Sequence, residues 1–324
     1  MIDSAVVLAI SASEHQSGLA DNRPKSMLPA LGKPLVVRVM ERLYRANIHH
    51  YYVVVGSNEG AVASYLSKQW KPDAKIEFVV RTTENISTLL SKIAQQINDS
   101  FIIASYNSFS YERFLASILK ENEDHPDHLI LAGAQLNMSP SEETYYAVLN
   151  EQRVTDIVTE KPAKDIRQLI LGEIAVCGTH FVNYLKTLDT KKTGNLAKNL
   201  FHVAKHYAAS ADAKVMADET SWMLRVQSDK DLLTLTKRLL EDSNDSHILS
   251  ELPYTVKIIP PVRIDPQVSV GQGVTIGPHV YVESGSSIGY GATIKNALIL
   301  DRSNVPANAQ IDNSIMTRRG IIKI

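Results

Sequence analysis

The sequence predicts an α/β domain with a mixed, mainly parallel sheet, followed by a short β-solenoid. Before residue 242, short apolar runs alternate with segments of helical spacing, which is typical of βαβ units. From Ile264 onward, apolar residues return at every sixth position, a period that fits stacked short strands and neither a lone helix nor a hairpin. A chain of 324 residues has room for one large domain and one smaller one.

The first part of the chain supplies the elements of the α/β domain in order. Residues 5–10 form a short apolar run, as expected for a buried parallel strand. Further strands are expected at 51–55, 76–80, 101–104, 128–132 and 145–149. Helical spacing predicts helices over 34–46, 59–68, 86–97 and 232–241, the last of which closes the domain.

A polar and acidic stretch over residues 241–246 separates the two parts. We place the domain boundary there or shortly after it, near Pro253 or the Pro260-Pro261 pair, because polar and proline-rich stretches are typical of linkers. The predicted domains are residues 1–245 and 258–324.

The six-residue period runs through the second part of the chain. Its apolar positions are Ile264, Val270, Ile276, Val282, Ile288, Ile294 and Leu300. A second ladder lies two residues before five of these positions, at Val268, Val274, Val280, Ser286 and Ala292. The pattern resembles the hexapeptide repeats of left-handed parallel β-helices, in which apolar side chains stack inside and glycine or asparagine serves the turns.

Composition excludes several function classes. Apolar residues make up 44% of the chain and the formal net charge is −1, so we expect neither nucleic acid nor a membrane as a partner. No apolar run reaches the roughly 20 residues that span a bilayer, and the N-terminus lacks the basic stretch of a signal peptide. A cytoplasmic location is therefore expected. Cys177 is the only cysteine, which excludes an internal disulfide and predicts a buried, small apolar side chain.

The most informative motif is residues 22–35, Asn-Arg-Pro-Lys-Ser-Met-Leu-Pro-Ala-Leu-Gly-Lys-Pro-Leu. We call it the signature segment, because it resembles the N-terminal signature of sugar nucleotidyltransferases, which join a sugar 1-phosphate to a nucleotide. With the repeats of the tail, nearly the whole chain resembles glucose 1-phosphate and mannose 1-phosphate nucleotidyltransferases. The resemblance implies a Rossmann-like nucleotidyltransferase domain followed by a short left-handed parallel β-helix.

The loop upstream of the signature segment departs from this family. The family's glycines fall on Ser11 and Ser13 and its arginine on His15. Glycines let the backbone approach a triphosphate closely, and histidine lacks the permanent charge and the forked donors of arginine. The resemblance therefore implies a phosphate loop that has lost its usual chemistry.

The family's metal carboxylates are missing as well. The resemblance places one at Tyr106, after the fourth strand, and the other at Arg225, before the closing helix. A phenol stays neutral and a guanidinium is positive, whereas Mg²⁺ prefers anionic oxygen ligands. We therefore expect no metal and no cofactor, and Mg²⁺ only if the chain is an enzyme after all.

Other family positions are retained. Lys25 matches the family lysine that contacts phosphate, and Glu160-Lys161-Pro162 matches the family's Glu-Lys-Pro, in which Glu contacts the sugar and Lys its phosphate. Arg23, Lys25, Glu160 and Lys161 are the candidate phosphate- or sugar-binding residues. The histidines at 49, 50, 202 and 206 invite a metal interpretation, but no carboxylate completes a spaced motif and a structural role is favoured.

Three functions remain open. The favoured one is a catalytically degenerate sugar nucleotidyltransferase-like protein, a regulatory or ligand-binding subunit that binds a nucleotide, sugar phosphate or sugar nucleotide without metal. The second is an active sugar 1-phosphate nucleotidyltransferase with an atypical loop, in which Glu14, Asp21 or Asp218-Glu219 supply substitute carboxylates. The third is a scaffold, as a homo-oligomer or as a hetero-oligomer with an active nucleotidyltransferase.

Overall fold

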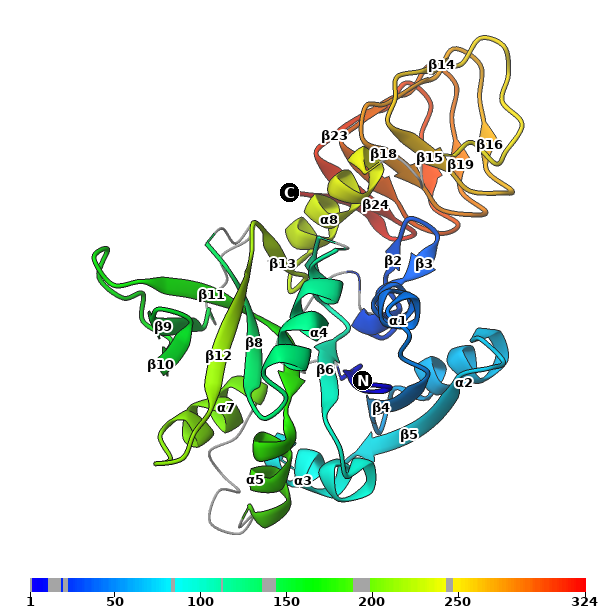
Figure 1. Cartoon of the computed structure of the whole chain (residues 1–324). Helices are drawn as coiled ribbons and strands as arrows, with labels where there is room; N and C mark the ends of the chain where they lie inside the picture. The colour runs from blue at the N-terminus through cyan, green and yellow to red at the C-terminus, as the bar shows by residue number, and fades with distance from the viewer. Residues whose placement is uncertain are drawn as a thin grey trace. The chain divides into compact units, whose positions relative to one another are not determined.

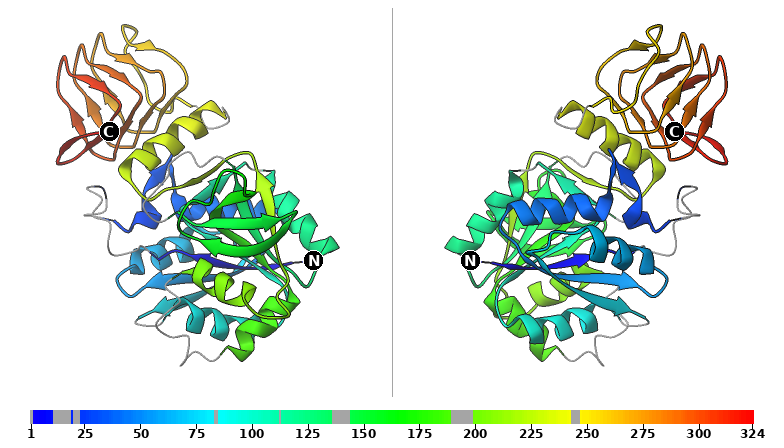
Figure 2. Two further views of the ribbon diagram at one scale, coloured as in Figure 1. Left: turned by 90° about the vertical axis from the view of Figure 1, so that its left-hand side faces the viewer. Right: turned by 90° about the vertical axis from the view of Figure 1, so that its right-hand side faces the viewer.

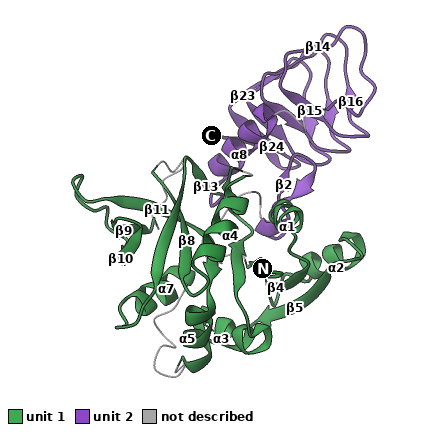
Figure 3. Ribbon diagram, in the orientation of Figure 1, with its two compact units in different colours: residues 1–11, 36–225 green, residues 12–35, 226–324 purple. Residues whose placement is uncertain are grey.

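The structure, a computed structural model, describes residues 2–10, 19, 23–82, 85–111, 113–135, 144–188, 199–242 and 247–324. Its residues fall into two compact units (Figure 3), unit 1 with residues 1–11 and 36–225, and unit 2 with residues 12–35 and 226–324. This division groups residues by their contacts. The predicted domains, residues 1–245 and 258–324, stay a prediction.

Unit 1 is built on a nine-stranded mixed sheet (Figure 1) in the order β5-β4-β1-β6-β11-β8-β12-β10-β9. Strands β5, β4, β1 and β6 are parallel to one another and β12 is parallel to β8, whereas β11 runs antiparallel to both β6 and β8. The bounds are β1 Ser4–Leu8, β4 His50–Gly56, β5 Lys75–Arg81, β6 Phe101–Ser105, β8 Leu129–Ala134, β9 Tyr146–Asn150, β10 Arg153–Val158, β11 Gln168–Cys177 and β12 Val215–Thr220.

Helices cover both faces of this sheet (Figure 2). The helices are α1 Leu35–Arg45, α2 Gly60–Gln69, α3 Ile86–Ile97, α4 Phe114–Asp124, α5 Thr179–Thr187 and α7 Leu200–Ala208. Side chains of α3, α5 and α7 form one buried apolar cluster with alternate residues of the strands, such as Val6 and Ile103. On the other face, α1 and α4 meet over Ala104 and Ile174. This alternation follows from the period of two along a strand.

A small second sheet stands at the end of the large one. The chain leaves β6 at Ser105, turns through Tyr106 and Asn107, and enters β7 Ser108–Ser110. Strand β7 pairs antiparallel with β13 Met223–Arg225, so that Arg225 lies opposite Ser108. The pairing brings together the two stretches onto which the resemblance places the family's metal carboxylates.

Unit 2 combines the described part of the signature segment with α8 Asp229–Glu241 and the C-terminal repeats. The signature segment forms a 3₁₀ turn, η1 Lys25–Met27, and a hairpin of β2 Pro29–Ala30 and β3 Lys33–Pro34. Its turn residues Leu31 and Gly32 have φ values of 50° and 75°, as the tight turns of β-hairpins require. A capping box between Ser228 and Asp231 begins α8.

The repeats form a parallel β-helix with three faces. The face β14-β17-β20-β23 comprises Lys257–Ile258, Thr275–Ile276, Thr293–Lys295 and Gln310–Asp312; the face β16-β19-β22 comprises Ser269–Val270, Ser287–Ile288 and Asn304–Val305. The third face is β15 Val262–Ile264, β18 Val280–Val282, β21 Ala297–Ile299 and β24 Ser314–Thr317, closed by the antiparallel β25 Gly320–Lys323.

Most positions of the two predicted ladders line the interior of the β-helix. The polar member Ser286 is also buried and donates a hydrogen bond to the Leu300 carbonyl at 2.8 Å. One position was predicted wrongly, because Ile299 and not Leu300 pairs with Val282. The corner at Asn296, which has a φ of 49°, is one residue shorter than the matching corner of the coil before it, and a fixed count of six cannot detect such a deletion.

Of the elements predicted in the first part, the helix over 86–97 matches α3 at both ends, and the others agree to within three residues. None of the described helices has the length and apolar character that would let it cross a bilayer.

Candidate functional site

The site that the sequence points to begins where β6 ends. Tyr106 is 4% exposed and its backbone N–H donates to the Leu8 carbonyl of β1 at 3.0 Å. Asn107 is 8% exposed, and its Oδ1 has no hydrogen-bond partner within the described part of the chain. Both residues thus follow the carboxyl end of β6, next to the carboxyl end of the parallel strand β1, where α/β sheets place their ligand sites.

Arg225 is held in this region by an ion pair. Its Nη2 lies 3.3 Å from Oε1 of Glu173, and the two side chains are 10% and 12% exposed. The guanidinium carbon also stands 5.9 Å from the centroid of the Phe201 ring, within reach of a cation–π attraction. A buried pair of this kind is neutral as a unit, and each charge depends on the other because neither is well solvated.

The position of Glu173 follows from an irregularity in β11. The register of β11 against β8 shifts between Leu171 and Ala175, and such a shift re-aims the side chains within it. The Glu173 N–H donates to Ser108 Oγ at 3.1 Å. At Gly172 a Cβ would stand 1.7 Å from the Met223 sulfur, so only glycine leaves room for β13 beside β11.

A divalent metal ion does not fit the described groups around Arg225. The residues that the resemblance assigns to the two metal positions are Tyr106, a phenol, and Arg225, a guanidinium, and the carboxylate of Glu173 is paired with Arg225. The described residues contain no group of three or more His, Cys, Asp or Glu side chains that could hold a metal ion. Mg²⁺ prefers several oxygen ligands and is repelled by an adjacent guanidinium.

Arg23 and Lys25 lie within unit 2 and face acidic groups there. The Arg23 guanidinium contacts Glu283 at 3.3 Å and also pairs with Asp301. Lys25 is 9% exposed; burial lowers the pKa of its ammonium, and the charge of Asp229 offsets part of that shift. Both cations therefore have acidic groups nearby within their own unit.

Glu160 and Lys161 follow β10 and are exposed, which leaves them accessible to a ligand. Asp218 and Glu219 belong to β12, and burial raises the pKa of the Asp218 carboxyl. Glu219 lies 3.9 Å from Arg167. The remaining candidates, Ser11, Ser13, His15, Glu14 and Asp21, lie outside the described residues.

The four histidines that invited a metal interpretation contact carboxylates or tyrosine side chains. His50 Nε2 lies 2.8 Å from Glu77, and His49 lies 3.7 Å from Asp73. His206 shares a hydrogen bond of 3.0 Å with the Tyr184 hydroxyl, and the His202 ring packs edge-on against Tyr145. Cys177 is fully buried, and burial raises the pKa of its thiol, which confirms the prediction of a small apolar side chain.

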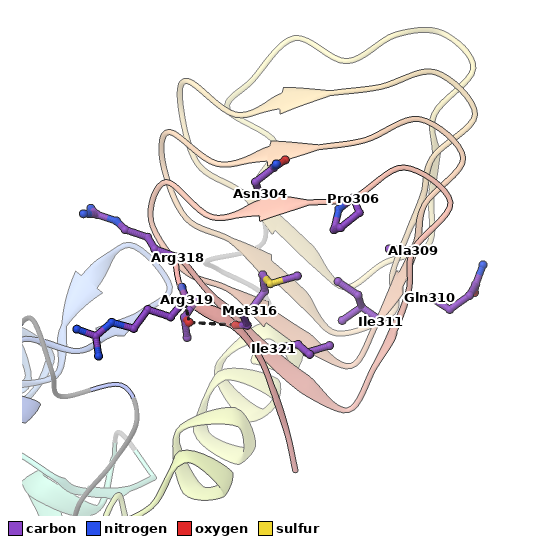
Figure 4. A pocket seen from close by; sticks show the side chains of 11 residues that line it. Asn304, Pro306, Ala309, Gln310, Ile311, Met316, Arg318, Arg319 and Ile321 are labelled. Atoms are coloured by element: carbon purple, nitrogen blue, oxygen red, sulfur yellow. Dashed lines mark hydrogen bonds between the residues drawn. The ribbon is translucent and has the colours of Figure 1, made fainter.

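A cavity of about 480 Å³ lies at the C-terminal end of the β-helix. Figure 4 shows Ile311, Met316 and Ile321 around its interior, while the side chains of Arg318 and Arg319 extend away from it. It belongs to unit 2 and is distinct from the groups around Arg225.

Sequence reasoning missed Glu173, Glu283 and Asp301. Glu173 had a signal, because it is the one charged residue in an otherwise apolar run over residues 169–177, and a buried charge requires a partner. Glu283 and Asp301 each come shortly after a ladder position. Nothing local in the sequence links them to Arg23, more than 250 residues away.

Comparison with known proteins agrees with this architecture. The nucleotidyl transferase family matches residues 5–223, more than half of the chain, and the GMPPB C-terminal domain matches residues 258–323. A bifunctional sugar-1-phosphate nucleotidylyltransferase/acetyltransferase of Sulfurisphaera tokodaii is 25% identical over 333 residues, covering 96% of this chain and 79% of the relative.

Solved structures show the same fold. A Bacillus anthracis protein described as a candidate glucose-1-phosphate thymidylyltransferase superposes with a TM-score of 0.62 at 15% identity, covering 74% of this chain and 96% of that one. The inositol-1-phosphate CTP transferase of T. maritima gives a TM-score of 0.57 at 16% identity, covering 73% and 96%. The chain therefore belongs to the nucleotidyl transferase family, as a sugar nucleotidyltransferase-like member with a hexapeptide-type C-terminal domain.

Proposed function

We propose that this chain is a catalytically degenerate member of its family, a regulatory, ligand-binding or scaffolding subunit in sugar-nucleotide metabolism. The observation that carries the proposal is the buried ion pair between Arg225 and Glu173. The resemblance puts a metal ligand at the position of Arg225, and the carboxylate of Glu173 is paired with this guanidinium.

The ligand class follows from the charges that remain. A guanidinium and ammonium groups can offset phosphate charge directly, through charge-assisted hydrogen bonds. In unit 1 the exposed Lys161 is the cation proposed for this role, with Glu160 on the sugar hydroxyls, and in unit 2 the candidate is Lys25. The expected ligands are a nucleotide, a sugar phosphate or a sugar nucleotide, bound equally well with and without Mg²⁺.

Calorimetric titration with these three ligand classes, with Mg²⁺ and with EDTA, tests the proposal. We expect saturable binding that is unchanged by EDTA, and pyrophosphate release at the background rate. Lys161→Gln should weaken binding by about tenfold, the equivalent of about 1.4 kcal/mol. Lys164→Gln, an exposed lysine in the same loop, is the matched control. Binding that requires Mg²⁺ would contradict the proposal.

The second candidate is an active sugar 1-phosphate nucleotidyltransferase, which would require Mg²⁺. It is favoured by the match of the family over residues 5–223 and by the retained Lys25. Asp218 and Glu219, or Glu14 and Asp21, would then supply carboxylates. Mg²⁺-dependent pyrophosphate release from a panel of nucleotides and sugar 1-phosphates, abolished in Lys25→Ala, would establish it in place of the degenerate function.

The proposed subunit role also names a partner, either a second copy or an active nucleotidyltransferase of the same family. Co-purification from the source cells, followed by light scattering of the purified chain alone, separates these arrangements. A chain that stays monomeric and captures no nucleotidyltransferase would restrict the proposal to a free ligand-binding protein.

A further inference from the structure

Three carboxylates stack along one corner of the β-helix. Asp265 and Glu283 each directly follow the last residue of a strand, and Asp301 stands at the same corner of the next coil. The Asp301 N–H donates to Glu283 Oε2 at 2.8 Å. We call Asp265, Glu283 and Asp301 the acidic corner. Neighbouring strands of a sheet lie only about 5 Å apart, so carboxylates stacked in this way repel one another unless cations separate them.

Arginines neutralise the acidic corner. Arg263 Nε donates to Asp265 Oδ1 at 2.8 Å, and Arg318 pairs with Asp301. Arg263 and Arg318 belong to the β-helix itself. The third arginine, Arg23, comes from the signature segment and bridges Glu283 and Asp301.

A second contact binds the hairpin of the same segment to the same corner. The Gly32 N–H donates to the Tyr281 hydroxyl at 2.8 Å, and that hydroxyl donates to Asp265 Oδ2 at 2.7 Å. Tyr281 is fully buried. The Arg263 guanidinium lies where a side chain on residue 32 would begin, with Nη2 2.5 Å from an ideal Cβ. The signature segment is thus held at two points, Arg23 and Gly32.

We propose that the acidic corner of the β-helix clamps the signature segment, so that Arg23 is a positioning residue and not a ligand contact. Lys25 lies two residues beyond Arg23 in η1, and the clamp fixes its place. The importance of placing Lys25 rests on the function proposed above, in which Lys25 contacts the ligand. The clamp itself does not depend on that function. The β-helix is then part of the binding machinery and not only an appendage.

Hydrogen exchange tests the clamp without any ligand. Arg23→Gln and Glu283→Gln should each speed amide exchange in peptides covering residues 23–35 by tenfold or more, about 1.4 kcal/mol of local opening. Arg23→Lys keeps the charge and should restore much of the protection. Arg302→Gln removes an exposed charge from the adjacent turn and serves as the control. Unchanged exchange in Arg23→Gln would refute the clamp.

The pH dependence separates a charged clamp from simple packing. The groups that face Glu283 are Arg23, Asp301 and Tyr281. Burial raises the pKa of the Glu283 carboxyl. The positive charge of Arg23 lowers this pKa, and the negative charge of Asp301 raises it. The effect of Arg23→Gln should be largest at pH values above this raised pKa, where Glu283 is ionised, and should shrink as the pH falls through it. Arg23→Gln in a Glu283→Gln background should lose this dependence. An exchange difference that is the same at every pH would contradict the clamp.

The direction in which Glu283→Gln changes the ligand affinity shows whether Arg23 positions Lys25 or contacts the ligand. If Arg23 positions Lys25, Glu283→Gln loosens the segment and weakens binding, by about tenfold or less. If Arg23 is a ligand contact, the same substitution releases it from its carboxylate and strengthens binding, which would overturn the assignment. Should the wild-type chain bind none of the nucleotides, sugar phosphates or sugar nucleotides, the proposed function fails, and hydrogen exchange still decides for or against the clamp.

Discussion

Two of the candidate site arginines form ion pairs with carboxylates of the same chain. Arg225 is paired with Glu173 in unit 1, and Arg23 with Glu283 and Asp301 in unit 2. Buried ion pairs seldom add much stability, because the desolvation of both partners offsets their attraction. Their effect is to make each member dependent on the other. A substitution of one partner therefore tests the pair more sharply than a substitution of both.

We expect Glu173→Gln to destabilise the protein by about 3 kcal/mol, because it leaves the Arg225 charge buried and unpaired. Arg225→Gln should cost a similar amount. The double variant should cost clearly less than the sum, since it buries no unpaired charge. Denaturant unfolding of the four proteins measures this cycle. Additive losses would mean that the two side chains do not depend on each other, and Arg225 would then be available to a ligand at little cost.

At the scale of elements, the pairing of β7 with β13 builds the candidate site. This pairing joins residues more than 110 positions apart, and it depends on the close approach of Met223 to β11 at Gly172. Glycine weakens a strand unless something must come near its backbone. Here the sulfur of Met223 occupies the space that a side chain would need.

Gly172→Ala should therefore destabilise unit 1 by about 1–3 kcal/mol through overpacking. Met223→Ala alone should also destabilise, through a cavity. Combined with Gly172→Ala, it should cost less than the sum, because the shorter side chain makes room for the new methyl group. Thermal unfolding of the single and double variants measures the effect. A Gly172→Ala protein as stable as the wild type would show that β13 moves away from β11 without penalty.

Local patterns predicted the elements, and non-local pairing limited the prediction of the site. Helix α3 and the β-helix interior follow from periods of 3.6 and six residues, which are readable within one segment. Glu173 required a register shift in β11, and Arg23 required a partner 260 residues away. The residue types at Tyr106 and Arg225 were readable from the sequence. The carboxylate that pairs with Arg225 was not, because no fixed spacing relates residues 173 and 225.

At the scale of the whole molecule, the described residues include two apolar cores that share no residue. One lies between the large sheet and the helices α3, α5 and α7, and the other fills the β-helix. Each is a closed set of buried side chains, so each can lose its packing as a cooperative unit.

Calorimetry should therefore resolve at least two unfolding transitions. Ile103→Ala and Ile276→Ala are a matched pair, since both side chains are fully buried, one in each core. Each should cost about 2–5 kcal/mol and lower the Tm of a different transition. A single transition that both variants shift equally would show instead that the two cores unfold together.

At its C-terminal end, the three faces of the β-helix finish differently. On one face β25 turns back against β24, whereas β22 and β23 lie at the edges of their sheets. Ile276 and Ile294 pair across successive coils, eighteen positions apart. A duplicated segment of that length, inserted after Asp312, would find two strand edges ready to receive it and would move β24 and β25 together by one coil. The solenoid can therefore lengthen in whole steps by duplication, and its length is open to evolutionary change without any revision of the coils already present.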